Sequence, residues 1–219
     1  MLTVTNASGF GSGGGPDATV SYESTAANTA DQSSPYTFSS QGIGTAAANR
    51  TVVVVTIAHI NAGTISAVTI GGNSATEIVN LDAGGASQEE QVAMWAYDLT
   101  TGTTADIVVT TGAANRCQIG VWALYGVGAP NQTVEDKTGA LSQSITLEAG
   151  GVAVAGSVNN AEGSTVTSWG SDFTERYDTA VEPHTKASGA DSTGGGSKTV
   201  SVTWSSGGNA LIAAAWPKG

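Results

Sequence analysis

The chain has 219 residues, of which 18 are acidic and seven are Lys or Arg, so its formal net charge is −11 at pH 7. It lacks the cations that neutralise phosphate groups, which excludes electrostatic binding of nucleic acid and polybasic contact with a membrane. Apolar residues make up 40% of the chain, enough for a substantial core, whereas charged residues make up only 11%. The polar surface is therefore expected to consist mainly of Ser, Thr, Asn, Gln and Gly.

The first 34 residues predict a loop or an arm. The stretch MLTVTNASGFGSGGG has no cationic region and no apolar core, so we expect synthesis in the host cytoplasm without a signal peptide. The Gly-rich segment 9–17 is typical of a long flexible loop between two strands. The alternative is that residues 1–34 form an arm that docks on a neighbouring subunit. The glycines at 13–16 and 193–197 lack phosphate-loop spacing, so no nucleotide cofactor is expected.

Short strand patterns, divided by Gly, Asn, Ser and Asp, follow one another along the rest of the chain. The segment KTVSVTW at 198–204 alternates, with its valines and tryptophan on one face. The run VVVV at 52–55 is apolar on both faces, which predicts a central strand covered on both sides. Many short strands without an amphipathic helix predict an all-β, antiparallel sandwich or jelly roll.

The chain also contains a weak internal repeat. Residues 107–110 (IVVT) match 200–203 (VSVT), and residues 52–55 match 152–155. This pattern predicts two tandem related sandwiches, the first at 1–128 with the N-terminal arm (1–34) and the second, shorter one at 129–219. The alternative is that the match is coincidental, because any two Val/Thr-rich β segments can be aligned.

The stretch DIVVTTGAANRCQIGVWALYG at 106–126 predicts a hairpin, because two apolar runs flank Gly-Ala-Ala-Asn. It contains the only cysteine, Cys117, and a nucleophilic cysteine needs a base such as His59 or His184. The repeat places Cys117 opposite Ala210, and a free cysteine often packs as a small apolar residue. We therefore interpret Cys117 as a core residue and expect neither a catalytic residue nor an enzyme.

Other candidate sites are weaker. The acidic residues follow no calcium-loop spacing and the two histidines have no zinc spacing, so no metal and no cofactor are expected. A calcium site, if one exists, would use the acidic residues of 172–191. Trp169 precedes Gly170 at the end of a strand and is the candidate exposed ring for carbohydrate stacking.

Four segments carry a resemblance to a known class of proteins: IGTAAANRTVVVVTIA, ISAVTIGGNSATEIV, MWAYDLTTGTTADIVVTT and IGVWALYG. Together they resemble β-sandwich proteins encoded by tailed bacteriophages and gene transfer agents. Such proteins are virion surface components, either head spikes and decoration proteins or modules of tails and fibres. The resemblance covers residues 36–128 well and the second half less well, and it brings no catalytic residues with it.

The resemblance implies a structural, homo-oligomeric protein at the virion surface, a head spike or decoration subunit that assembles on the capsid. Its expected partners are copies of itself and other virion proteins. The alternative is a tail-fibre or tail-tip host-attachment module that binds cell-surface polysaccharide. The low charge and the lack of disulfides agree with either function.

Overall fold

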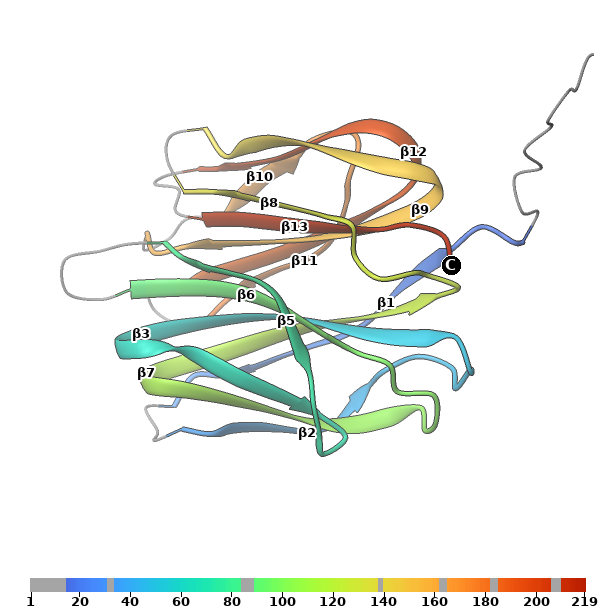
Figure 1. Cartoon of the computed structure of the whole chain (residues 1–219). Helices are drawn as coiled ribbons and strands as arrows, with labels where there is room; N and C mark the ends of the chain where they lie inside the picture. The colour runs from blue at the N-terminus through green and yellow to red at the C-terminus, as the bar shows by residue number, and fades with distance from the viewer. Residues whose placement is uncertain are drawn as a thin grey trace, which may run out of the picture.

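The structure is a computed structural model that describes residues 15–30, 34–83, 89–137, 140–161, 165–181, 185–205 and 210–219. Its regular elements are all β-strands, and they form two antiparallel sheets, which confirms the predicted all-β sandwich class. Figure 1 shows the strands of the first half packed against those of the second half. Within the described ranges no helix is long and apolar enough to cross a membrane.

The first sheet has the strand order β1-β7-β3-β6-β5, with β2 paired to β7 and β4 paired to β3. Because β3 and β7 are long and bend, the sheet folds over on itself. The start of β7 pairs with β2 and with the end of β3, whereas its last residues pair with β1 and with the start of β3. The strands are β1 (Thr19–Asn28), β2 (Tyr36–Gly42), β3 (Arg50–Ile70), β4 (Asn73–Ser74), β5 (Thr76–Asp82), β6 (Glu89–Tyr97) and β7 (Thr104–Tyr125).

The second sheet is built in the same way. Its long strands β9 and β12 pair with each other along most of their length, β13 joins the end of β9, and β10 joins the end of β12. The edges are completed by β8 on β13 and β11 on β12. The strands are β8 (Gln132–Asp136), β9 (Ser142–Asn159), β10 (Val166–Trp169), β11 (Thr174–Ala180), β12 (Lys186–Trp204) and β13 (Ala210–Trp216).

The two halves share one order of strands. In the first half, neighbouring strands pair in the order β1-β7-β3-β6-β5. In the second half, they pair in the equivalent order β8-β13-β9-β12-β11. The register agrees as well, because Ala58 lies opposite Cys117 in the first half and Val158 lies opposite Ala210 in the second. Cys117 and Ala210 therefore occupy equivalent positions. These pairings support the internal repeat, and a tandem origin of the two sandwiches stays a prediction.

Three apolar cores fill the molecule. One lies inside each half, and a third lies between the halves and takes residues from both sheets. Val52 and Val54 belong to the core of the first half, whereas Val53 and Val55 belong to the shared core. All four are 0% exposed, so the prediction that VVVV is covered on both sides is confirmed. The shared core joins the halves into one packed body.

The predicted hairpin at 106–126 is wrong. Thr104–Tyr125 is a single strand, and its equivalent strands β12 and β13 both pair with β9 instead of with each other. A tight turn at Gly112 would favour a positive φ there, but the positive φ in this region belongs to Gly63 of β3. A Cβ atom on Gly63 would lie 3.0 Å from Gly112 Cα. The small residues therefore allow two bent strands to cross closely.

Part of the segment 1–34, expected to form an N-terminal arm, is a strand. Thr19–Asn28 is strand β1, which pairs with β7 of its own sheet, and docking of the segment on a neighbouring subunit stays a prediction. Residues 1–14 lie outside the described residues. The boundary expected between 128 and 129 falls in the connection between β7 and β8.

Candidate functional site

The best-defined concave site is a groove where the two halves meet beside the connection 126–131. It has a volume of about 660 Å³ and is lined by the starts of β3 and β5, the end of β6 and the last residue of β13. A second hollow of about 350 Å³ continues it between β5 and β8 and shares Thr76, Ile78 and Pro130 with it. We call the two together the seam groove.

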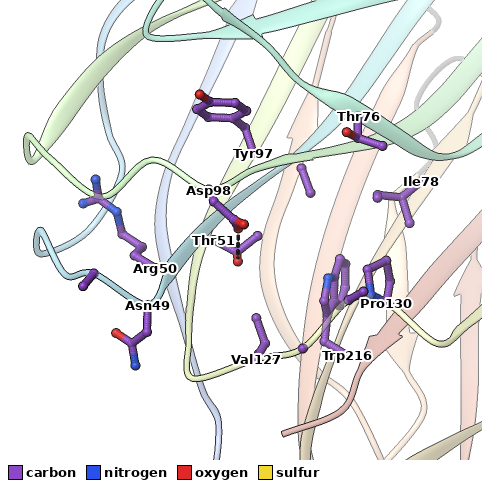
Figure 2. Close-up of a pocket in the computed structure, with 14 residues that line it drawn as sticks. Asn49, Arg50, Thr51, Thr76, Ile78, Tyr97, Asp98, Val127, Pro130 and Trp216 are labelled. Atoms are coloured by element: carbon purple, nitrogen blue, oxygen red, sulfur yellow. Dashed lines mark hydrogen bonds between the residues drawn. The ribbon is translucent and has the colours of Figure 1, made fainter. Parts of the chain in front are cut away.

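One wall of the seam groove is polar. Figure 2 shows Thr51 and Asp98 side by side, with the Thr51 hydroxyl donating to Asp98 Oδ1 at 2.6 Å. This bond holds the exposed Asp98 carboxylate in one orientation. Glu77 lines the second hollow, but its carboxylate accepts from Asn80 Nδ2 at 2.9 Å, and Asn80 also donates to the Ile65 carbonyl, so this carboxylate is held toward the first half. The groove therefore presents one oriented carboxylate, that of Asp98.

Arg50 also lines the seam groove, but its guanidinium is committed to the protein. The side chain is 1% exposed and donates four hydrogen bonds of 2.7–2.9 Å to backbone carbonyls. One of these carbonyls belongs to Gly44, between β2 and β3. The others belong to Leu99, Thr101 and Gly102, between β6 and β7. Arg50 thus stabilises the loops and has little capacity left for an anionic ligand.

The opposite wall is apolar. It is formed by Ile78, Val127 and Pro130, with Trp216 as the floor. Trp216 is only 1% exposed, so its indole faces are covered by the shared core. Figure 2 shows the Tyr97 ring pointing away from this wall. The groove consequently combines an aliphatic wall with the oriented carboxylate of Asp98.

A buried polar cluster joins the halves on another side of the shared core. Asp191 of β12 is 2% exposed and accepts hydrogen bonds from Arg176 Nε at 2.7 Å, Arg176 Nη2 at 2.8 Å and Trp122 Nε1 at 3.0 Å. Arg176 belongs to the second half and Trp122 to the first. The hydrogen bond to Asp191 raises the pKa of Arg176. This cluster fixes how the halves sit against each other.

Two tyrosines surround Trp122 in this cluster. The ring centroids of Tyr22 and Tyr177 lie 5.4 Å and 5.9 Å from that of Trp122. Tyr177 leaves room only for glycine beneath it, because a Cβ atom on Gly120 or Gly189 would approach its ring to 2.4 Å or 2.5 Å. Burial raises the pKa of the Tyr177 phenol far above its usual value, with a smaller contribution from Tyr22.

Replacing Tyr177 with phenylalanine should stabilise the protein by up to about 1 kcal/mol at pH 7, because its buried hydroxyl has no hydrogen-bond partner among the described residues. In the wild type the unfolded chain loses this phenol proton above pH 10 whereas the folded protein keeps it, so stability falls as the pH rises further, at about 1.4 kcal/mol per pH unit. Urea denaturation at pH 7 and pH 11 should show a smaller alkaline loss in Tyr177→Phe. A variant less stable than the wild type at pH 7 would contradict this.

A second buried polar contact joins the halves at the far end of the shared core. Glu90 Oε1 accepts hydrogen bonds from His59 Nδ1 at 2.7 Å and from the Thr185 hydroxyl at 2.9 Å, and both Glu90 and His59 are almost fully buried. The alternation of Glu90 with Val92 and Met94 is the signal that places it on the buried face.

Cys117 packs in the core of the first half, as predicted, and is 0% exposed. Its neighbour across the strands is Ala58, so His59 points to the opposite face of the sheet. Burial raises the pKa of the Cys117 thiol. His184, the other candidate base, lies outside the described residues. The structure therefore does not bring Cys117 and His59 together.

Cys117 should not react with iodoacetamide in the native protein at pH 8, because alkylation needs an accessible thiolate. Mass spectrometry should find complete modification only after unfolding in guanidinium chloride. Cys117→Ala should cost no more than about 1–2 kcal/mol, since Ala210 fills the equivalent position. Rapid alkylation of the folded protein would contradict the buried position.

The expectation that Trp169 is an exposed ring is wrong. Its side chain is 9% exposed, belongs to the core of the second half, and donates from Nε1 to the Ser188 hydroxyl at 2.9 Å. The pairing Trp169–Val202 turns the ring inward, because successive residues of a strand alternate between faces. A sugar stacks on an exposed ring face, which this position does not offer.

The acidic residues described within 172–191 do not converge on one point, and Glu182 lies outside the described residues. Asp172 accepts from the Thr199 backbone N–H, Asp178 from the Val166 backbone N–H, and Asp191 from Arg176 and Trp122. In the part of the chain that the structure describes, no group of three or more His, Cys, Asp or Glu side chains could hold a metal ion.

Comparisons with family models, curated proteins and solved structures find no match to this chain.

Proposed function

We propose that this chain is a structural component of a phage or phage-like particle, a head spike or decoration protein that assembles on the capsid surface. The proposal starts from the resemblance of its strand and turn segments to virion β-sandwich proteins. The architecture supports it further, because two antiparallel sheets pack over a shared apolar core and form one packed body suited to presentation on a surface.

The observation that carries the proposal is the exposed face of the second half. Most outward residues in the first part of β9 and the neighbouring part of β12 are hydroxyl side chains over a buried apolar layer, and Glu148 is an exposed acidic residue that follows them on β9. This is a broad sheet face of low charge, a type common on virion proteins and adhesins. Its exposed hydroxyl residues are Ser142, Ser144, Thr146, Ser197, Thr199 and Thr203.

Locating the chain in an intact particle tests the proposal. Antibodies raised against the recombinant protein would be used for immunogold electron microscopy of particles purified from the source cells, together with mass spectrometry of those particles. Regular labelling of the shell supports the proposal. Labelling confined to the tail tip would replace it with host attachment, and absence from purified particles would refute both.

A further inference from the structure

We infer that the Gln132 and Asp136 side chains of β8 form a clasp that keeps the edge of β9 from pairing with a second copy of this chain. The inference goes beyond the proposed function and does not depend on it, because it rests on hydrogen bonds between these two strands. It concerns the first part of β9, residues 142–147, and the edge that this segment turns toward β8.

The first part of β9 has a strand partner on one side. β12 pairs with it there, and among the described residues no ladder joins its other side to β8. A bare strand edge presents backbone N–H and C=O groups to which another strand can add, so an unprotected edge leads to self-association. The backbone groups on the β8 side therefore need other partners.

Two side chains of β8 occupy this edge. The Thr146 backbone N–H donates to Gln132 Oε1 at 2.6 Å, and the Ser142 backbone N–H donates to Asp136 Oδ2 at 3.0 Å. Gln132, Val134 and Asp136 are half-buried and alternate with exposed residues, so all three face inward. Val134 packs against the core of the second half between the two clasp residues. A strand that added to β9 would have to displace both clasp side chains.

Side chains close an edge of the first half in the same way. Ile65 of β3 pairs with Thr111 of β7 on one side. Its backbone N–H donates to Gln91 Oε1 at 2.6 Å, and its backbone C=O accepts from Asn80 Nδ2 at 3.0 Å. These amides come from β6 and β5. Polar side chains thus take the place of a neighbouring strand in both halves, which supports a protective role for the clasp.

The strand that the clasp excludes is the same segment of a second copy. Residues 142–147 read SQSITL, without charge, glycine or proline, and such segments pair readily with copies of themselves. Two of these edges can pair antiparallel without bringing like charges opposite each other, although the whole chain carries −11. The outward residues Ser142, Ser144 and Thr146 supply hydroxyls for cross-strand pairs. The edge is therefore self-complementary once its N–H groups are released.

The test removes the clasp from the full chain with the double variant Gln132→Ala, Asp136→Ala, the clasp variant. Sedimentation velocity at equal concentration should give it about twice the mass of the wild type or more, because the edge of β9 can then join a second copy. Adding Ser144→Lys should restore the wild-type mass, since lysines would oppose each other in the pair. At low concentration, hydrogen exchange at the Thr146 amide should be about tenfold faster in Gln132→Ala, because the N–H loses its acceptor.

Two controls keep the clasp or its acceptors. Thr133→Ala, Glu135→Ala truncates two exposed residues of the same strand and also removes one acid. Gln132→Glu, Asp136→Asn keeps an acceptor oxygen at both positions and leaves the net charge unchanged. Both should keep the wild-type mass.

Three results would overturn the inference. They are a folded clasp variant with the wild-type mass, equal association of either control, and association that Ser144→Lys does not reduce. Urea denaturation shows whether each variant is folded. If the clasp variant is not, Gln132→Ala alone carries the test, and unchanged exchange at Thr146 in that variant would refute the clasp.

Discussion

Replacing Trp122 with alanine is expected to lower the free energy of unfolding by about 4 kcal/mol, the largest effect of any single change argued for this protein. Trp122 is 0% exposed, lies in the shared core and packs against one tyrosine from each half. Its removal leaves a large cavity between the sheets and deprives the buried Asp191 of one hydrogen bond. Guanidinium denaturation followed by circular dichroism measures this loss.

The shared core also predicts how unfolding proceeds. Because both halves contribute to one core, wild-type unfolding should be a single cooperative transition, the same for probes in either half. Trp122→Phe keeps an aromatic ring and should cost much less than Trp122→Ala. If Trp122→Ala lowered the stability by less than 1 kcal/mol, or the wild type showed two separate transitions, the halves would be independent domains.

The sequence predicted the parts of the fold that depend on local patterns. Alternation and turn residues identified most strands, and the run at 52–55 identified a strand covered on both sides. The equivalence of Cys117 and Ala210, found by aligning the halves, agrees with the strand register. These features follow from which side chains face a core, and that is encoded residue by residue.

The sequence did not predict features that depend on how distant strands meet. The segment at 112–115 has turn-like composition, yet its small residues serve a close crossing of β3 and β7. Trp169 precedes a glycine at the end of a strand, a pattern that predicts an exposed ring, yet its pairing with β12 turns it inward. Local composition cannot distinguish a turn from a close crossing, because both favour small residues.

The candidate site was hidden for the same reason. The seam groove combines Asp98 and Thr51 of the first half with Pro130 of the connection and Trp216 of the second half. No motif joins these positions, since they come together only when the two sheets pack. The period-2 pattern around Glu90 could have revealed a buried carboxylate, but its partner Thr185 lies in the other half.

Replacing Arg176 with methionine should lower the free energy of unfolding by about 3 kcal/mol. Methionine keeps an apolar stem of similar length but removes both charge-assisted hydrogen bonds to Asp191. The carboxylate, 2% exposed, would be left buried with Trp122 Nε1 as its remaining donor. Arg176 is itself 36% exposed, so the cost comes chiefly from the Asp191 carboxylate, which stays buried without its charged partner. Urea denaturation at pH 7 measures the effect.

The double variant Arg176→Met, Asp191→Asn separates this cause from packing. Asparagine removes the buried charge and keeps an oxygen that can accept from Trp122 Nε1. If the unpaired charge is responsible, the double variant should recover most of the lost stability and lie within about 1 kcal/mol of the wild type. If it remained as unstable as Arg176→Met, the cost would come from the packing of the arginine stem, and Asp191 would not depend on Arg176 for charge compensation.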